Sequence, residues 1–187
     1  MNADNLRPTA EQRRPDLLMR LAGPSSVDDL AKLWVDAESS RRASESPSSP
    51  DHPLDLRVIS RRLTTLIGHT GTIPLIARLG DQPAAMTVVV QGRADDGASD
   101  NPEPGLAHVT MVAVRPDLWG HRYGEGVLRH AVERAARQGY RRAQLWTPAS
   151  NRRARSLYER LGWTLSGRER QTEDGELLIH YELDLTE

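Results

Sequence analysis

The sequence predicts an α/β (α+β) fold with the element order β-α-α-β-β-β-α-β-α-β-β. Short apolar segments typical of strands are separated by turn residues from longer segments whose apolar residues recur at helical spacing. The strand-helix-strand unit over 106–147 is where parallel strand pairing is expected. Two final strand-like segments, joined by a turn at 173–175, predict a closing antiparallel pair.

The first half of the chain is expected to hold three strands and two helices. Residues 24–26 form a typical helix start, and the Ser/Pro-rich segment 44–53 predicts a loop before the second helix. Residues 1–16 are polar and predict a flexible tail, so a single domain is expected over 17–187. The expected elements are a strand at 17–22, helices at 27–42 and 54–68, and strands at 73–79 and 84–91.

The second half contains two strand-to-helix turns and a closing hairpin. The strand at 106–114 stops at an Arg-Pro pair, and the helix after it has one apolar face and ends at Gly139. A further strand leads to a helix that begins at the N-cap residue Asn151. Residues 92–105 are rich in acids, glycine and proline and predict a mobile hairpin loop. The last two strands are expected at 163–170 and 177–185.

Composition excludes several classes of protein. The 187 residues suit one domain with a sizeable core, and a net charge of −1 gives no general attraction to nucleic acid. The absence of cysteine excludes a thiol nucleophile and a disulfide framework. Arginines interrupt residues 1–25, and no later run approaches the ~20 apolar residues of a membrane span, so a cytoplasmic location is expected. No pair of histidines or carboxylates has the spacing of metal ligands, so no metal is predicted.

The two strand-to-helix turns together predict one ligand site. A helix start offers free backbone N–H groups, and glycines before it let backbone approach a ligand closely, which favours a phosphate. The first turn lacks G-K-[ST], so it is not a Walker A loop, and Gly120, Gly124 and Gly126 do not fit G-x-G-x-x-G. On the turn alone, a tight connection without a ligand is the alternative.

Two motifs carry a resemblance to a known family. V-A-V-R-P-x-x-W-G-H-R-Y-G-E-G-V-L, followed by N-x-x-A-x-x-x-Y-E-x-x-G-W, resembles the GCN5-related N-acetyltransferase (GNAT) superfamily. The match is strong over 106–163 and extends to the rest of the chain by element order. The resemblance implies a mixed, mostly antiparallel seven-stranded sheet flanked by about four helices, in which two parallel neighbours splay to admit the cofactor. It also implies acetyl-CoA as co-substrate and direct transfer of the acetyl group from the thioester to an amine.

The resemblance assigns roles to residues of both motifs. The first motif binds the pyrophosphate of acetyl-CoA through backbone amides, and a backbone N–H of the strand before it binds the developing oxyanion. The second motif places Asn151 on the pantetheine arm and Tyr158 near the CoA sulfur, so Tyr158 is the predicted proton donor for the leaving thiolate. The cofactor-binding residues implied in this way are Val112, Ala113, Val114, Gly120, His121, Arg122, Tyr123, Gly124, Glu125 and Asn151.

The predicted acceptor of the amine proton is His108. It lies on the strand before the first motif, shares the side-chain parity of Thr110 and Val112, and is similar to a strand histidine in a member of the family. A histidine accepts a proton near neutral pH, directly or through water. A histidine at the solvated start of a strand is the alternative. His180, which alternates with Glu182, is expected to point into solvent.

The sequence departs from the family pattern at two positions. Trp119 occupies the family's Q/R position, and Arg122 occupies its central glycine. An arginine with positive φ would be strained, so either the loop follows a different path or Arg122 keeps a negative φ and offers its guanidinium to a phosphate. We predict the second arrangement; a weakened or lost CoA site is the alternative. Arg152 and Arg153 are further candidates for the 3′-phosphate of CoA.

The acceptor is the part that the motifs determine least. In the family it is held by the first two helices, their loop and the closing hairpin. Asp36, Glu38 and Glu45 could attract a cationic amine, although such acids are more often solvated. A small amine is expected as acceptor, without nucleic acid or membrane as partner, and a homodimer is left open. The alternatives are a CoA-binding or regulatory module without catalysis and a protein N-terminal or lysine acetyltransferase.

Overall fold

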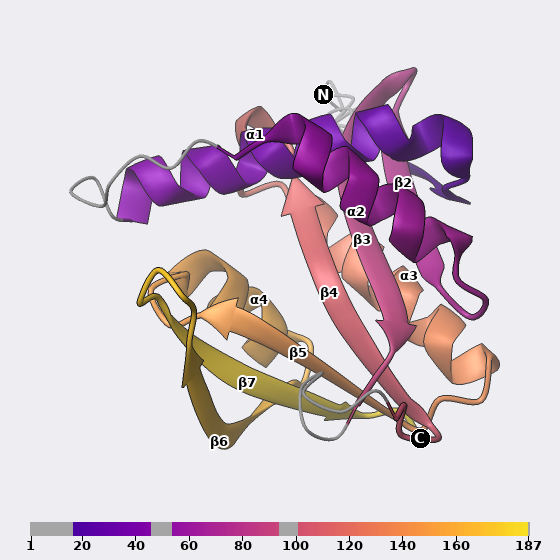
Figure 1. Cartoon of the computed structure of the whole chain (residues 1–187), viewed down its shortest axis with the longest axis vertical. Helices are drawn as coiled ribbons and strands as arrows, with labels where there is room; N and C mark the ends of the chain where they lie inside the picture. Colours follow the sequence, from indigo (N-terminus) through magenta and orange to yellow (C-terminus); the bar gives the residue numbers. More distant parts are fainter. Residues whose placement is uncertain (1–16, 46–53, 94–100, 187) are drawn as a thin grey trace, which may run out of the picture.

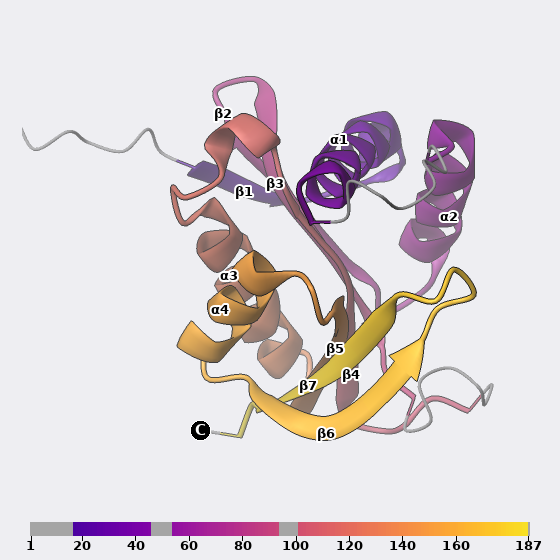
Figure 2. The ribbon, with the colours of Figure 1, turned by 90° about the vertical axis from the view of Figure 1, so that its left-hand side faces the viewer.

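A mixed sheet of seven strands forms the centre of the protein, with helices on both of its faces (Figure 1, Figure 2). The predicted fold class and element order are confirmed. The tail predicted at 1–16 lies outside the described residues, as do most of the loop at 44–53 and the central part of the loop at 92–105. The computed structural model describes residues 17–45, 54–93 and 101–186.

The strands follow the order β1-β2-β3-β4-β5-β7-β6 across the sheet. The pair β4 and β5 is parallel, as a strand-helix-strand crossover requires, and all other neighbours are antiparallel. The strands are β1 (Leu17–Leu21), β2 (Ile73–Leu79), β3 (Gln82–Gln91), β4 (Leu106–Val114), β5 (Arg142–Pro148), β6 (Thr164–Gln171) and β7 (Leu177–Asp184).

Two pairs of helices cover the two faces of the sheet (Figure 2). One apolar cluster, which includes Leu30, Leu63 and Met86, packs α1 and α2 on one face. A second cluster, which includes Leu128 and Tyr181, packs α3 and α4 on the other face. Among the described residues no helix is long and apolar enough to cross a membrane. The helices are α1 (Val27–Glu45), α2 (Leu56–Gly68), α3 (Tyr123–Arg137) and α4 (Arg152–Arg160), with 3-10 turns at Pro24–Ser26 and Pro116–Leu118.

A β-bulge interrupts β4 in front of the site. Val89 of β3 pairs with Val109, but the preceding Val88 pairs with Met111, so Thr110 is an extra residue on β4. The bulge reverses the alternation of side chains along the strand, because Val109 packs in the α3 and α4 cluster whereas Met111 packs in the α1 and α2 cluster. Period-two alternation from the sequence therefore fails beyond this point.

The parallel strands β4 and β5 separate halfway along their length. Their pairing runs from Leu106–Arg142 to Val109–Leu145, while β4 stays paired with β3 as far as Val114. In Figure 1 the two strands start side by side and diverge toward their carboxyl ends. The second half of each strand thus presents an unpaired backbone edge to the space between them, as the predicted splay requires.

Candidate active site

A pocket of about 540 Å³ occupies the space between the diverging strands. Its walls are the second half of β4, the end of β5, the start of α3 and one face of α4, and Trp34 and Arg41 of α1 close one side. Of the residues predicted to bind the cofactor or to act in catalysis, the following line the pocket: Val112, Ala113, Val114, Gly120, Arg122, Tyr123, Gly124, Glu125, Asn151 and Tyr158.

Two predicted site residues lie outside the pocket lining. His121 is exposed, and its Nδ1 lies 3.1 Å from the carbonyl oxygen of Trp119. His108 precedes Val109, the first residue of β4 that lines the pocket. The expected parity of His108 with Val112 is wrong, because the bulge at Thr110 lies between them. His108 pairs with Val90, which packs against the α1 and α2 cluster.

The backbone of β4 supplies hydrogen-bond donors to the pocket. The amide N–H of Arg115 donates to Ala84 of β3 at 2.9 Å, and successive residues of a strand point their N–H groups to opposite sides. The N–H of Ala113 therefore points to β3, whereas those of Val112 and Val114 point toward β5, where pairing has ended. This leaves two of the three predicted residues, Val112 and Val114, as donors that face the pocket.

The loop before α3 brings its backbone close to the pocket with two residues of positive φ. Gly120 has φ of 85°, and Arg122, the residue before α3, has φ of 63° and ψ of 16°. The predicted negative φ of Arg122 is therefore wrong. Arg122, at the position of the family's central glycine, takes the left-handed conformation, at a cost of about 1 to 2 kcal/mol for a residue with a Cβ. Since the first N–H groups of a helix have no partner within it, the start of α3 presents donors to an anion.

Close packing holds the start of α3 against its neighbours. A Cβ added to Gly124 would lie 3.3 Å from side-chain atoms of both Val114 and Leu157. Trp119, at the family's Q/R position, donates from Nε1 to the carbonyl oxygen of Val114 at 2.8 Å. The guanidinium of Arg153 lies 4.0 Å from the centre of the Trp119 ring. Trp119 thus connects the loop to the end of β4 and to α4.

Two residues of the second motif have the local structure that the sequence predicts. Asn151 is the N-cap of α4, and its side chain accepts a hydrogen bond from the amide of Ala154 at 3.0 Å. Tyr158 is 5% exposed and packs against the rings of Trp163 and Tyr181. Burial raises the pKa of the Tyr158 hydroxyl, although a hydrogen bond with Thr147 acts in the opposite direction. The hydroxyl therefore stays protonated at neutral pH.

A network of charged side chains closes the pocket on the side of α1. The guanidinium of Arg41 lies 2.6 Å from Glu38, 3.0 Å from Glu45 and 3.0 Å from Glu176 in the turn between β6 and β7. Burial raises the pKa of Glu38, but hydrogen bonds from Arg41 and Arg42 outweigh it, so the net pKa lies below the ordinary value. Glu38 lines the pocket as a carboxylate that arginines hold, which makes it a weak base.

Sequence reasoning missed several residues of the pocket wall. Trp34 and Arg41 belong to a helix whose pocket-facing residues carry no motif, and Trp146 stands in a strand before the second motif that carries no motif of its own. His180 was expected to face solvent but is fully buried, with Nε2 3.2 Å from Oε1 of Gln144 and Nδ1 2.7 Å from Oγ of Ser166. Polar partners from other strands make this burial compatible with a histidine.

Comparison with known proteins identifies the family. The model of the acetyltransferase (GNAT) family matches residues 31–163, so the chain belongs to that family. Family membership implies acyltransferase activity. A search of curated protein sequences gives no match.

Solved structures share the fold at low sequence identity. The ribosomal-protein-S18-alanine N-acetyltransferase of Escherichia coli is 17% identical, with a TM-score of 0.67 over 92% of this chain and 96% of its own. The Paia N-acetyltransferase of Thermoplasma acidophilum, in complex with coenzyme A, is 11% identical, with a TM-score of 0.64 over 90% and 99%. The yncA protein of Salmonella typhimurium, with its cofactor acetyl-CoA, is 16% identical, with a TM-score of 0.64 over 92% and 95%.

Proposed function

We propose that the protein is an acetyl-CoA-dependent N-acetyltransferase that moves the acetyl group directly to the amine of a small molecule. The observation that carries the proposal is the pocket between β4 and β5. It brings the N–H groups of Val112 and Val114, the start of α3, Asn151 and Tyr158 to one space. Neighbours with the same fold contain coenzyme A or acetyl-CoA, which supports this choice of co-substrate.

The residues of the pocket fit a long cofactor with an anionic end. The N–H groups at the start of α3, together with the guanidinium of Arg122, suit a pyrophosphate. Asn151 lines the pocket, where it would hold the pantetheine arm in addition to capping α4. Arg153, held over Trp119, is placed for a phosphate at the outer end. No group of three or more potential metal ligands is found among the described residues.

When bound, acetyl-CoA supplies its acetyl group as a thioester: a bond forms between the carbonyl carbon and the acceptor nitrogen, the C–S bond breaks, and the amine loses a proton. The N–H groups of Val112 and Val114 are the proposed donors to the oxyanion. The Tyr158 hydroxyl is the proposed donor to the leaving thiolate. Because its pKa is raised while that of a free thiol is about 8.5, Tyr158 stabilises the thiolate by a hydrogen bond more readily than by complete proton transfer.

The proposed route for the amine proton runs through water to His108. His108 lies one residue before the pocket lining, and Glu38 is already held by Arg41 and Arg42. With His108 as the base, its replacement by alanine removes the rise of kcat/KM between about pH 5 and 8, the range in which histidine changes charge. An unchanged profile of kcat/KM against pH in the His108→Ala variant would remove His108 from the mechanism.

A CoA-binding module without catalysis is the second candidate. It is favoured by the position of His108 outside the pocket lining and by the ion pairs of Glu38. Release of free thiol from acetyl-CoA in the presence of a panel of amines separates the two. An enzyme acetylates at least one amine with turnover, whereas the module binds acetyl-CoA and acetylates none. Modification of peptides alone would instead indicate a protein acetyltransferase.

A further inference from the structure

The pocket is flanked by a second group of side chains on the face of the sheet that carries α1 and α2. Thr110 and Trp146 both line the pocket, and they are the first residues beyond Val109–Leu145, the last pair of β4 with β5. They therefore stand at the point where the two strands part. Each of them is also contacted by an arginine from another element.

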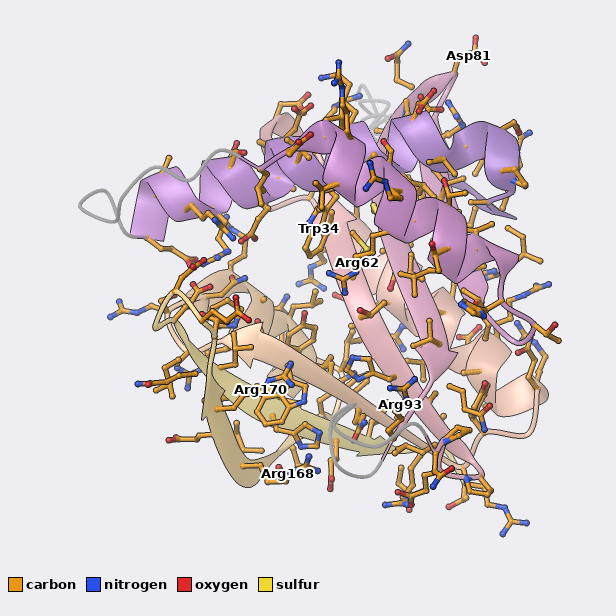
Figure 3. The ribbon with its side chains drawn as sticks, in the orientation of Figure 1. Trp34, Arg62, Asp81, Arg93, Arg168 and Arg170 are labelled. Carbon is orange, nitrogen blue, oxygen red and sulfur yellow. The ribbon has the colours of Figure 1, made fainter. Side chains whose placement is uncertain are left out.

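Arginines reach this point from two sides. From α2, the guanidinium of Arg62 donates to Oγ1 of Thr110 at 3.0 Å. From β6, the guanidiniums of Arg170 and Arg168 lie 4.5 Å and 5.5 Å from the centre of the Trp146 ring. Figure 3 shows Arg62 close to the helices α1 and α2, and Arg170 and Arg168 lower in the view, on the side of β5, β6 and β7. An indole ring attracts a guanidinium to its face and leaves N–H donors at the edge of the guanidinium available.

The backbone of β6 is irregular where it delivers these arginines. Leu165 pairs with Tyr181 of β7, but the next pair is Glu169 with Ile179, so three residues stand opposite one. Gly167 within this bulge has φ of 81°, and Oγ of Ser166 accepts a hydrogen bond from the amide of Arg168 at 3.2 Å. Bulges redirect side chains, and this one is fixed to the buried His180 through Ser166. The bulge and the hydrogen bonds of Ser166 thus fix the position of Arg168 in the sheet.

Among the described residues, the acids near the pocket pair with cations other than Arg62 and Arg170. Asp36 pairs with Lys32 at 2.9 Å, and Glu38 and Glu45 pair with Arg41. Glu182 lies 3.8 Å from Nδ1 of His180. Within the part of the chain that the structure describes, Arg62 contacts a hydroxyl and Arg170 an aromatic ring, with no carboxylate in an ion pair with either. The arginines here offer positive charge, whereas the acids of α1 were expected to offer negative charge to the acceptor.

We propose that the acceptor is a small amine that also carries an anionic group, a carboxylate or a phosphate, and that Arg62 and Arg170, with Arg168 beside them, bind this group at the Trp146 edge of the pocket. The guanidinium fork matches both anions with two parallel hydrogen bonds. This assignment rests on the proposed function, because it places the amine of the same molecule in front of Val112 and Val114. The acceptor would thus carry a charge opposite to that of Arg62 and Arg170.

Matched pairs of acceptors test the assignment. β-Alanine is compared with β-alaninamide for the carboxylate, O-phosphoethanolamine with ethanolamine for the phosphate, and putrescine serves as the cationic amine. We expect kcat/KM to be about tenfold or more higher for the anionic member of at least one pair, since a hydrogen bond to a charged group changes affinity by that order. The preference should fall in Arg62→Gln and Arg170→Gln. Arg61→Gln, an exposed neighbour of Arg62 on α2, should keep it.

The outcomes separate this assignment from the proposed function. Transfer to neutral or cationic amines at equal or higher rate overturns the anionic acceptor and leaves the acetyltransferase in place. If no amine is acetylated, the proposed function fails. Thermal unfolding in the presence of O-phosphoethanolamine or β-alanine then tests whether the anion site exists independently of acetyl transfer. A stabilisation that Arg170→Gln removes supports the site; no stabilisation by either compound overturns it.

Discussion

The proposed cofactor side of the pocket is built mainly from backbone at two strand-to-helix turns, whereas its proposed acceptor side is built from side chains that meet from distant parts of the sequence. The turn at Gly120–Gly124 and the cap at Asn151 are each contained in one short segment. By contrast, the contact of Arg41 with Glu176 joins residues 135 positions apart, and that of Arg62 with Thr110 joins residues 48 apart. A side built from local backbone depends on one short motif, while the other side depends on side chains from several elements.

The largest expected effect concerns the chemistry on the cofactor side. Tyr158→Phe removes the hydroxyl but keeps the ring that packs against Trp163 and Tyr181. Because the thiolate loses its hydrogen-bond donor, we expect kcat to fall by about 100-fold with little change in acetyl-CoA affinity. Steady-state kinetics of thiol release measures the fall, and Tyr140→Phe, outside the pocket lining, is the matched control. Unchanged acetyl transfer would show that Tyr158 does not act on the leaving group.

The acceptor side is expected to depend on Arg41 for its stability. Arg41→Met leaves the carboxylates of Glu38, Glu45 and Glu176 close together without their shared cation, so we expect a loss of about 2 to 4 kcal/mol in the free energy of unfolding near pH 7. Denaturant unfolding measures this loss. Arg42→Met is the milder control, because Arg42 is half-exposed and, of these three carboxylates, contacts that of Glu38 only.

The same network predicts how stability depends on pH. The folded protein holds the pKa of Glu38 below its ordinary value, so the stabilisation from this carboxylate is present above about pH 4.3 and is lost as pH falls through the lowered pKa. The difference between the wild type and Arg41→Met should therefore shrink below about pH 4. A difference that stays constant down to pH 3 would mean that the ion pairs do not stabilise the fold.

The smallest expected effect concerns the strained residue of the cofactor side. Arg122→Gly relieves the left-handed backbone at a small entropic cost, so we expect a gain of about 0.5 to 1 kcal/mol, or about 1 to 4 °C in Tm. Arg122→Lys keeps both the strain and the charge and should leave Tm unchanged. A lower Tm in Arg122→Gly would show that contacts of the guanidinium outweigh the strain.

The same contrast explains what could be predicted from the sequence. Strand and helix order, the cap at Asn151 and the turn before α3 follow from local patterns, and they are found where expected. The φ of Arg122 was predicted wrongly because the prediction used the preference of arginine for negative φ. The path of the loop is set instead by the packing at Gly124 and the hydrogen bond of Trp119. The side of the sheet on which His108 lies was predicted wrongly, because the bulge at Thr110 depends on how β4 pairs with β3. His180 was misplaced because its partners lie on β5 and β6.

Thermal unfolding with and without saturating acetyl-CoA tests the central claim that the pocket between β4 and β5 binds this cofactor, with ATP and NAD at equal concentration as controls. At about 100 times the dissociation constant, binding adds roughly 2.7 kcal/mol, which corresponds to a rise in Tm of about 5 to 10 °C for a domain of this size. A rise with acetyl-CoA and none with ATP or NAD is the predicted result. No rise with acetyl-CoA, or an equal rise with ATP, would contradict the account.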